Sequence, residues 1–348
     1  MANRAKLPIT TITNQSNYIT LAGYDLTRQE KRILYRIVEA AAEYREQNKA
    51  FFDMHKRMDV LEDKSFLMPI SNFLTSEEAK DPSGTAYEQV VDAFDRLVKK
   101  VIKIKNKGYF DIGGVILHAW RNKGEASVSF LVNRNVWQAA LDFTSGFTKL
   151  DIATAFNLKS AYSMRFYEMA KIYHDTNVWR ISVEDFRKQF GCESKYPIFA
   201  DLRRYTIDVA KKELDTISPI SFTYEQEKKG RKVVKFKFTF ELTKRGKELK
   251  KSEQEEKRKL TEIQAKYAID MMDCQVKHWL RDKLNMNTKE ISSNIKTWTD
   301  LEDTFKKETL NELEETFQYI NRKGYRAAEN VGWFIQNIKK KIENARKK

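Results

Sequence analysis

Residues 196–242, YPIFADLRRYTIDVAKKELDTISPISFTYEQEKKGRKVVKFKFTFEL, are the stretch of the chain that decides its fold. From Tyr196 to Asp215 apolar side chains recur at helical spacing, which predicts a long amphipathic helix. The segments ISFTYEQ and KVVKFKFTFEL then alternate apolar and polar residues on either side of Lys228-Lys-Gly230-Arg, which predicts a β-hairpin. We therefore expect a long helix that is followed directly by a hairpin with a basic turn.

Two more helices are predicted before this pair. Residues 160–174, SAYSMRFYEMAKIYH, form the first, and residues 183–190 form a short second helix that Ser182 caps. The order helix, short helix, long helix and hairpin is typical of a winged helix, a variant of the helix-turn-helix.

The first half of the chain repeats this order. It contains an amphipathic helix at residues 26–44 with Asp25 as N-cap, a short helix at 71–78 and a strongly amphipathic helix at 85–101. The segments VIKIKN, GVILHAW and ASVSFLV then predict one small antiparallel sheet with basic loops. The expected fold is therefore α+β and mainly helical, with two tandem winged-helix domains.

The domain organisation follows from these elements. We expect an N-terminal arm at residues 1–18, a first winged helix at 19–135, a second at 136–243, and a charged helical C-terminal extension at 244–348. The start of the extension interleaves opposite charges, as a solvated helix or linker does. Its later part holds Met271, Trp279, Trp333 and other apolar residues, which must pack within the extension, on the domains or on a partner.

The net charge is +15, from 64 Lys and Arg against 49 Asp and Glu, and it is unevenly distributed. Residues 99–123 carry +6 and residues 195–250 carry +7. Such a surface attracts polyanions or acidic membranes. No run approaches the roughly 18 apolar residues of a membrane helix, and residues 1–18 do not resemble a signal peptide. We expect a cytoplasmic protein with no membrane partner.

The second winged helix is predicted to read DNA with its long helix. If Phe199, Leu202, Thr206, Val209 and Ala210 face the core, Arg204 and Lys211 lie on the far side and Arg203 on its flank. Arginine suits a guanine edge because it can donate two hydrogen bonds to it. The remaining candidate DNA contacts of this copy are Lys195 before the helix and, in the hairpin, Lys228, Lys229, Arg231 and Lys232.

The first winged helix departs from this pattern. Its long helix exposes Glu88, Asp92 and Asp95, which would repel phosphates, before it reaches Arg96, Lys99 and Lys100. We expect this copy to hold the DNA backbone by the end of that helix and by a basic wing. The candidate wing contacts are Lys103, Lys105, Lys107, Arg121 and Lys123.

Catalytic motifs are lacking in the sequence. The four histidines form no HxH or HExxH pair, neither Cys192 nor Cys274 belongs to a CxxC, and no GxxxxGK[ST] phosphate loop exists. We expect two free thiols, no metal, no cofactor and no enzymatic activity. Fifteen tyrosines leave a DNA-nicking nucleophile open by composition, although rolling-circle nickases need a histidine pair for their metal.

Short motifs of the second copy resemble the theta-type plasmid replication initiators, which bind direct DNA repeats called iterons. They are KSAYSMRFYE at residues 159–168, WRISVEDF at 179–186, YPIFADLRR at 196–204, and KKGR at 228–231 before FKF at 236–238. The first copy resembles the family more loosely, through LTRQE at 26–30 and Ala119-Trp120. The resemblance covers about residues 15–243, and the extension has no counterpart in it.

The resemblance implies that monomers bind origin iterons with both domains and open the origin, while dimers bind an operator and repress their own gene. It also implies the bacterial host's replicative helicase and host initiator as partners. Arg203 and Arg204 match the family's basic reading helix, and Tyr205 replaces a third basic residue often found there, so the base sequence that is read can differ.

A dedicated winged-helix transcription regulator is the alternative, because repression uses the same surfaces. Direct repeats of about two helical turns beside the gene favour an initiator, whereas an inverted repeat favours a regulator. A nicking enzyme is a third hypothesis.

Overall fold

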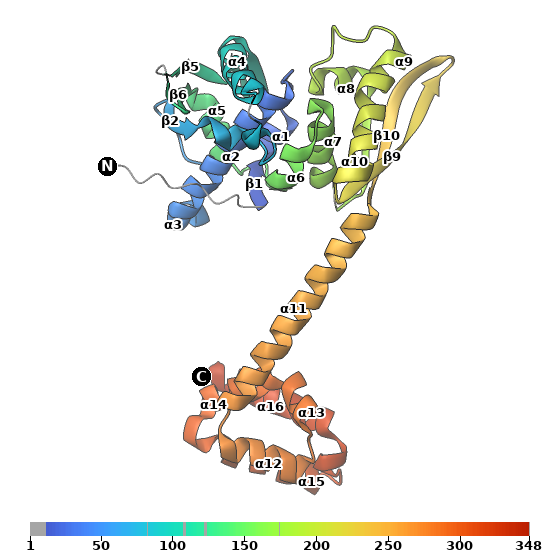
Figure 1. The fold of residues 1–348 in the computed structure, drawn as a ribbon. Coiled ribbons are helices and arrows are strands. Elements are labelled where there is room, and N and C mark those ends of the chain that lie inside the picture. Colours follow the sequence, from blue (N-terminus) through green and yellow to red (C-terminus); the bar gives the residue numbers. More distant parts are fainter. Residues whose placement is uncertain (1–11, 82, 107–108, 122–123, 174, 348) are drawn as a thin grey trace. The chain divides into compact units, whose positions relative to one another are not determined.

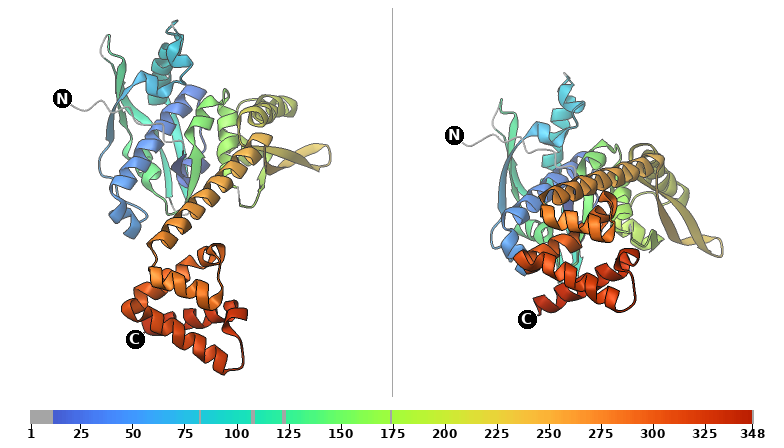
Figure 2. Two further views of the ribbon diagram at one scale, coloured as in Figure 1. Left: turned by 60° about the horizontal axis from the view of Figure 1, so that its bottom comes forward. Right: turned by 90° about the horizontal axis from the view of Figure 1, so that it is seen from below.

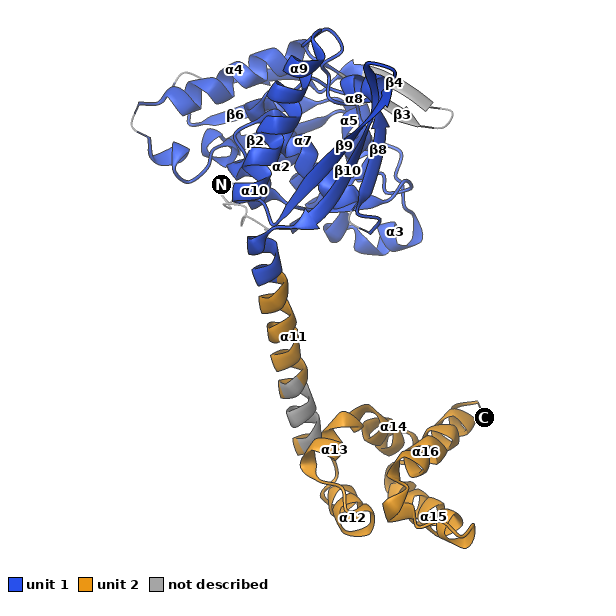
Figure 3. Ribbon diagram, turned by 90° about the vertical axis from the view of Figure 1, so that its right-hand side faces the viewer, with its two compact units in different colours: residues 1–249 blue, residues 250–348 orange. Residues whose placement is uncertain are grey.

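The structure is a computed structural model that describes residues 12–81, 83–106, 109–121, 124–173 and 175–347. For residues 102–106, 109–112, 262 and 264–269 it describes the backbone alone. The chain divides into two compact units, residues 1–249 and residues 250–348 (Figure 3).

The first winged helix begins with helix α2 (Arg28–Gln47). Strand β2 (Lys64–Pro69), two 3-10 turns η1 (Ile70–Phe73) and η2 (Glu78–Lys80), helix α4 (Thr85–Lys99) and strands β5 (Ile116–Trp120) and β6 (Ser127–Val132) follow (Figure 1). The strands form an antiparallel sheet in the order β2-β6-β5. Short helix α3 (Lys49–Met54) follows α2, and α5 (Arg134–Leu141) follows the sheet.

The second winged helix has the same order of elements. They are α7 (Ala161–Ile172), β8 (Val178–Ser182), α8 (Val183–Gln189), a long helix in three segments (α9, η3 and α10, residues 199–217), β9 (Ile220–Lys229) and β10 (Lys232–Leu242). Its sheet order, β8-β10-β9, repeats that of the first copy. The prediction of two tandem winged helices is confirmed.

Four connecting elements lie before and between the two copies. They are β1 (Ile12–Ser16), α1 (Asn17–Leu21), β7 (Phe147–Asp151) and α6 (Ile152–Asn157). Strand β1 pairs with β7 in an antiparallel sheet, so the segment before the first copy is joined to the segment that leads into the second.

Each copy has its own hydrophobic core. In the second copy, strand β10 turns Phe236, Phe238 and Phe240 inward at every second position, where Phe166 of α7 and Trp179 of β8 also pack. The first core extends from Ile19 to Leu141 and so includes α5. The predicted boundary between residues 135 and 136 lies within α5 and remains a prediction.

Three local predictions were wrong. Thr27, not Asp25, caps α2, where Thr27 and Glu30 form a reciprocal capping box. The expected helix at residues 71–78 is two short 3-10 turns. The first copy does not form one sheet, because β3 (Val101–Asn106) and β4 (Tyr109–Gly114) pair only with each other as an inserted hairpin. The Ser182 cap of α8 is confirmed.

The extension begins with the 28-residue helix α11 (Lys244–Met271). Helices α12 (Cys274–Leu284), α13 (Thr288–Ser293), α14 (Ile295–Phe305), α15 (Thr309–Arg322) and α16 (Val331–Arg346) follow, with 3-10 turns at Lys306–Glu308 and Ala327–Glu329. Helices α12 to α16 share a third core around the fully buried Trp298, so they form a unit with its own interior.

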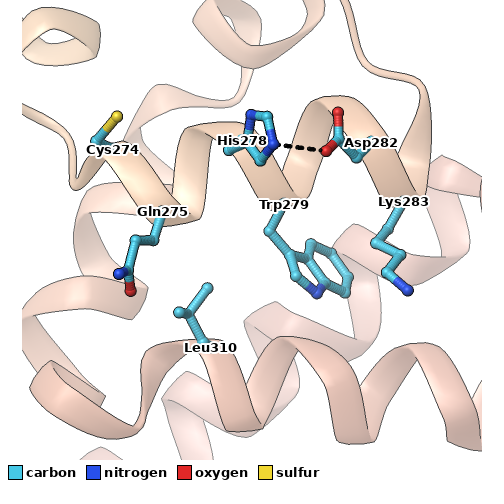
Figure 4. Close-up of a pocket in the computed structure, with 7 residues that line it drawn as sticks. All are labelled: Cys274, Gln275, His278, Trp279, Asp282, Lys283 and Leu310. Atoms are coloured by element: carbon cyan, nitrogen blue, oxygen red, sulfur yellow. Dashed lines mark ion pairs between the residues drawn. The ribbon is translucent and has the colours of Figure 1, made fainter.

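A shallow groove lies between α12 and α15 of this unit. Trp279 and Leu310 supply its apolar lining, and an exposed His278–Asp282 pair lies on its rim (Figure 4). The Trp279 side chain is also fixed by a hydrogen bond, because its indole nitrogen donates to the Glu314 carboxylate at 3.1 Å.

Candidate nucleic-acid interface

The long helix of the second copy contains a π-helical segment. It consists of α9 (Phe199–Leu202), the π segment η3 (Arg203–Asp208) and α10 (Val209–Ile217). A π turn holds one residue more than an α turn, so it shifts the phase of every side chain beyond it. The fully buried residues of the long helix are Leu202, Thr206, Ile207, Ala210 and Leu214. Two of them, Thr206 and Ile207, are consecutive and lie within the π segment, as expected where one residue is added to a turn.

The predicted core face of this helix is therefore correct at four of its five positions, and it departs from the structure at Val209, directly after the π segment. Leu202, Thr206 and Ala210 are buried as expected, and Phe199 packs partly buried against the core. Val209 is only partly buried, and Ile207, which was not expected inside, is fully buried.

Arg203 and Arg204 are both exposed, but their surroundings differ. The Arg203 Nε lies 3.3 Å from Asp208, whose carboxylate also accepts from the Tyr224 hydroxyl at 3.2 Å. Arg204 forms no ion pair with any described residue, and its guanidinium lies 5.6 Å from the centre of the Tyr205 ring. The Arg204 donors are therefore available to a ligand.

The π segment also changes which lysine, Lys211 or Lys212, shares the exposed face of Arg204. In an uninterrupted α-helix Lys211, seven residues after Arg204, would share its face within about 20°. The extra residue moves Lys212 to that face instead. Lys211 is held at 2.6 Å by Asp215, whereas Lys212 is exposed and unpaired among the described residues. Lys212 was not among the predicted contacts, because residue counting at α-helical spacing cannot detect a π turn.

Three of the four acidic residues of the long helix, all except Asp201, are already engaged. Glu213 accepts from the backbone amides of Lys159 and Ser160, and Asp215 accepts from Lys211 and from the Ser221 hydroxyl. Asp208 is occupied by Arg203. Arg204 and Lys212 are thus the two cations of the long helix that have no ion-pair partner among the described residues.

The tip of the hairpin β9–β10 carries a second group of cations. The two strands are joined by Gly230 and Arg231, and Gly230 has a φ of +63°, which a residue without a Cβ adopts without strain. Figures 1 and 2 show this hairpin projecting from its domain. We call its four exposed cations the wing tip; none has an ion-pair partner among the described residues, and they are Lys228, Lys229, Arg231 and Lys232.

Lys195 lies in a different environment from these residues. Its ammonium lies 2.7 Å from both carboxylate oxygens of Asp25, a residue of the first copy. The segment that leads into the long helix is held separately by Arg187, whose guanidinium donates to the carbonyls of Cys192, Lys195 and Tyr196. Lys195 therefore bridges the two copies in this structure.

The candidate contacts of the first copy lie on two hairpins. Lys103 and Lys105 belong to β3 of the inserted hairpin, whereas the exposed Arg121 follows β5 at the turn of the wing. Lys107 and Lys123 lie outside the described residues. Lys103, Lys105 and Arg121 therefore do not share one wing, contrary to our prediction.

The end of helix α4 is less available than predicted. Arg96 and Lys100 both bind the fully buried Glu30, at 2.8 and 2.6 Å, and Lys99 pairs with Asp95. Glu88, Asp92 and Asp95 are exposed along the same helix, as expected. These contacts join α4 to α2, so two of the three basic residues hold the domain together.

The two cysteines are free thiols in different environments. Burial raises the pKa of the Cys192 thiol to about 11, whereas Cys274 is exposed. Among the described residues there is no group of three or more His, Cys, Asp or Glu side chains that could hold a metal ion. None of the described helices is long and apolar enough to cross a membrane.

Two protein-family descriptions match the chain. Residues 12–171 match "Initiator Replication protein, WH1", and residues 182–240 match "Initiator Rep protein, WH2". Together the two matches cover more than half of the chain.

Individual relatives agree with this assignment. A probable replication protein of Bifidobacterium longum is 28% identical over 100 residues, which are 28% of this chain and 33% of that protein, so the match spans about a third of the relative. A crystal structure of the Pi initiator protein in complex with iteron DNA is similar with a TM-score of 0.51 and 20% identity. The similarity covers 68% of this chain and 100% of that chain, and it supports the fold. The chain belongs to the initiator Rep protein family.

Proposed function

We propose that this protein initiates replication of a bacterial plasmid by binding the iterons of the plasmid origin with both winged helices. The observation that carries the proposal is the pair Arg204 and Lys212, which lie on one face of the long helix without acidic partners among the described residues. Helix-turn-helix proteins place such a helix in the major groove. The Pi initiator, which has a similar fold, is a protein whose structure was solved with iteron DNA.

In this proposal the second copy both reads and holds the DNA. Arg204 contacts a base edge, Arg203 does so after release from Asp208, and the wing tip contacts phosphates. Lys211 contacts the DNA only if its ion pair with Asp215 is broken. The first copy holds the backbone through the inserted hairpin and through Arg121, with less base reading. The role is one of binding rather than catalysis.

We further propose that a dimer binds an operator and represses the protein's own gene. Support comes from the outer face of the β2-β6-β5 sheet. Leu67 is 68% exposed and Trp120 is 45% exposed, and both are paired in register with Ser129 of the central strand. Exposed apolar side chains that gather on one face mark protein–protein interaction sites. A second copy of the chain is the occupant that this proposal requires.

We assign the host replicative helicase and the host initiator to the C-terminal unit as partners. The assignment rests on the division of the chain, because the two winged helices end at Leu242 and the unit that follows has a core of its own. Loss of this unit is therefore compatible with an intact DNA-binding part.

A footprint of the full chain on its own origin DNA tests the main proposal. We expect protection of a series of direct repeats, each of about two helical turns, and loss of protection when the repeats are scrambled. The alanine variant of Arg204 should fail to protect the repeats at a concentration where the wild type does. Protection of a single inverted repeat alone would instead identify a dedicated transcription regulator.

A further inference from the structure

The two winged helices contact each other at two glycines, where the backbone of one copy lies against the backbone of the other. A Cβ atom added to Gly23 of the first copy would lie 2.9 Å from the Lys188 carbonyl oxygen of the second. A Cβ added to Gly191 would lie 2.5 Å from the Tyr24 carbonyl oxygen, and Gly191 also has a φ of +58°. A side chain at either point would clash with the backbone of the other copy, so the backbone there would have to shift.

A group of buried charges crosses the same contact. Lys31 of α2 and Glu168 of α7 are both fully buried, and the Lys31 ammonium lies 2.5 Å from Glu168 Oε1. Arg165 of α7 lies 3.0 Å from Glu168 Oε2, and the Gln15 amide donates to Oε1 at 3.1 Å. We call Lys31, Arg165 and Glu168 the interdomain ion cluster.

The neighbours of the cluster also come from both copies. The Tyr24 hydroxyl accepts from Lys31 and from Arg165, at 2.6 and 2.7 Å. The Arg165 guanidinium further donates to the carbonyls of Thr20, Ala22 and Gln189. Arg165 of the second copy is therefore held by backbone on both sides of the contact.

The charges of the cluster depend on this geometry. Burial opposes ionisation of Glu168, but the Lys31 and Arg165 charges and the hydrogen bonds hold its pKa below the ordinary value. Burial lowers the pKa of Lys31 to about 8 although Glu168 opposes this. A buried ion pair stabilises a fold little compared with apolar packing, but it strongly disfavours any arrangement that leaves a charge without its partner. The cluster therefore selects one placement of the two copies.

We propose that the interdomain ion cluster sets the distance and the angular phase between the two DNA-binding surfaces, so that Lys31, Arg165 and Glu168 are positioning residues for DNA recognition. They touch no DNA in this role. One base pair of added spacing turns the second subsite by about 34° around the duplex, since a helical turn holds about 10.5 base pairs. A rigid pair of domains accepts one spacing, whereas two freely jointed domains accept several. The proposal rests on the proposed function, because it requires both copies to bind one DNA site.

The experiment measures affinity as a function of spacing. A duplex selected from random-sequence DNA by the full-length protein supplies the probe, and a footprint locates its two subsites. One and two base pairs are then inserted or deleted between the subsites. Wild-type affinity should fall about tenfold or more away from the selected spacing, because simultaneous engagement of both subsites is lost.

Glu168→Gln keeps the shape of the side chain and removes its charge. We expect its affinity at the selected spacing to fall about 10- to 100-fold, with a nearly flat spacing profile and unchanged affinity for a single subsite. Glu312→Gln is the matched control, because Glu312 pairs with Lys341 in a partly buried ion pair that lies within the C-terminal unit. The control should keep the wild-type profile even if it is less stable.

Gly23→Ala tests the same placement of the two copies without changing any charge. It replaces the Glu168 variant as the test of the proposal if that variant does not fold. It should shift or flatten the spacing profile, whereas Gly332→Ala, at a glycine with open space around it, should not. A folded Glu168→Gln or Gly23→Ala protein with the wild-type spacing profile would overturn the proposal. A wild type that selects only one subsite would overturn two-domain binding itself, and the inference with it.

Discussion

Replacement of Arg204 by alanine separates base reading from phosphate attraction. Arg204 forms no ion pair with a described residue, so a guanine edge can take its donors without competition. A bidentate arginine contact contributes about 1–3 kcal/mol of discrimination, which corresponds to about 5- to 150-fold in affinity. Arg203 must first exchange its Asp208 partner, and exposed pairs of this kind are worth at most about 1 kcal/mol. We therefore expect Arg203→Ala to have an effect no larger than that of Arg204→Ala.

The assay is fluorescence anisotropy at one salt concentration, with the cognate repeat and a random duplex of equal length. Arg204→Ala should lose affinity on the repeat and change little on random DNA. Arg204→Lys keeps the charge but not the planar fork, so it should lose most of the same discrimination. Lys229→Ala is the control, because a wing-tip phosphate contact should weaken both complexes alike. Equal losses of Arg204→Ala on the two DNAs would refute the base-reading role.

Three further predictions concern other parts of the chain. If about eight phosphates are neutralised, the slope of log affinity against log salt concentration should be near −7 for the wild type. Replacing the four wing-tip cations by glutamine should make this slope shallower by about 3 to 4. An unchanged slope would place the wing away from phosphates. Lys212→Ala should weaken repeat binding more than Lys211→Ala does, because Lys211 is occupied by Asp215; the reverse order in a binding titration would contradict the phase shift. A chain that ends at Thr243 should bind one repeat like the full protein and fail in a plasmid-maintenance test, and loss of repeat binding by the folded truncation would place part of the DNA-binding surface in the extension.

Most of the fold could be predicted from the local periodicity of apolar and polar residues. Alternating residues placed Phe236, Phe238 and Phe240 inside, and the Ser182 cap and the basic turn at Gly230 lie where short-range pattern predicted them. These features depend on neighbours a few residues away, which a sequence displays directly. The exposed, unpaired wing tip belongs to the same class, since a hairpin turn exposes its side chains in almost any context.

The sequence by itself thus determined two winged helices, their order, the basic wing of the second and the family resemblance. Only the tertiary structure decided which charges remain for DNA. Lys195 meets Asp25 across 170 residues of chain, and Glu30 binds Arg96 and Lys100 of another helix. The π turn, which exchanges Lys211 for Lys212, is likewise a property of backbone hydrogen bonding and not of residue pattern. Ion pairs between distant segments form when the packed cores bring those segments together, so no local pattern can reveal them.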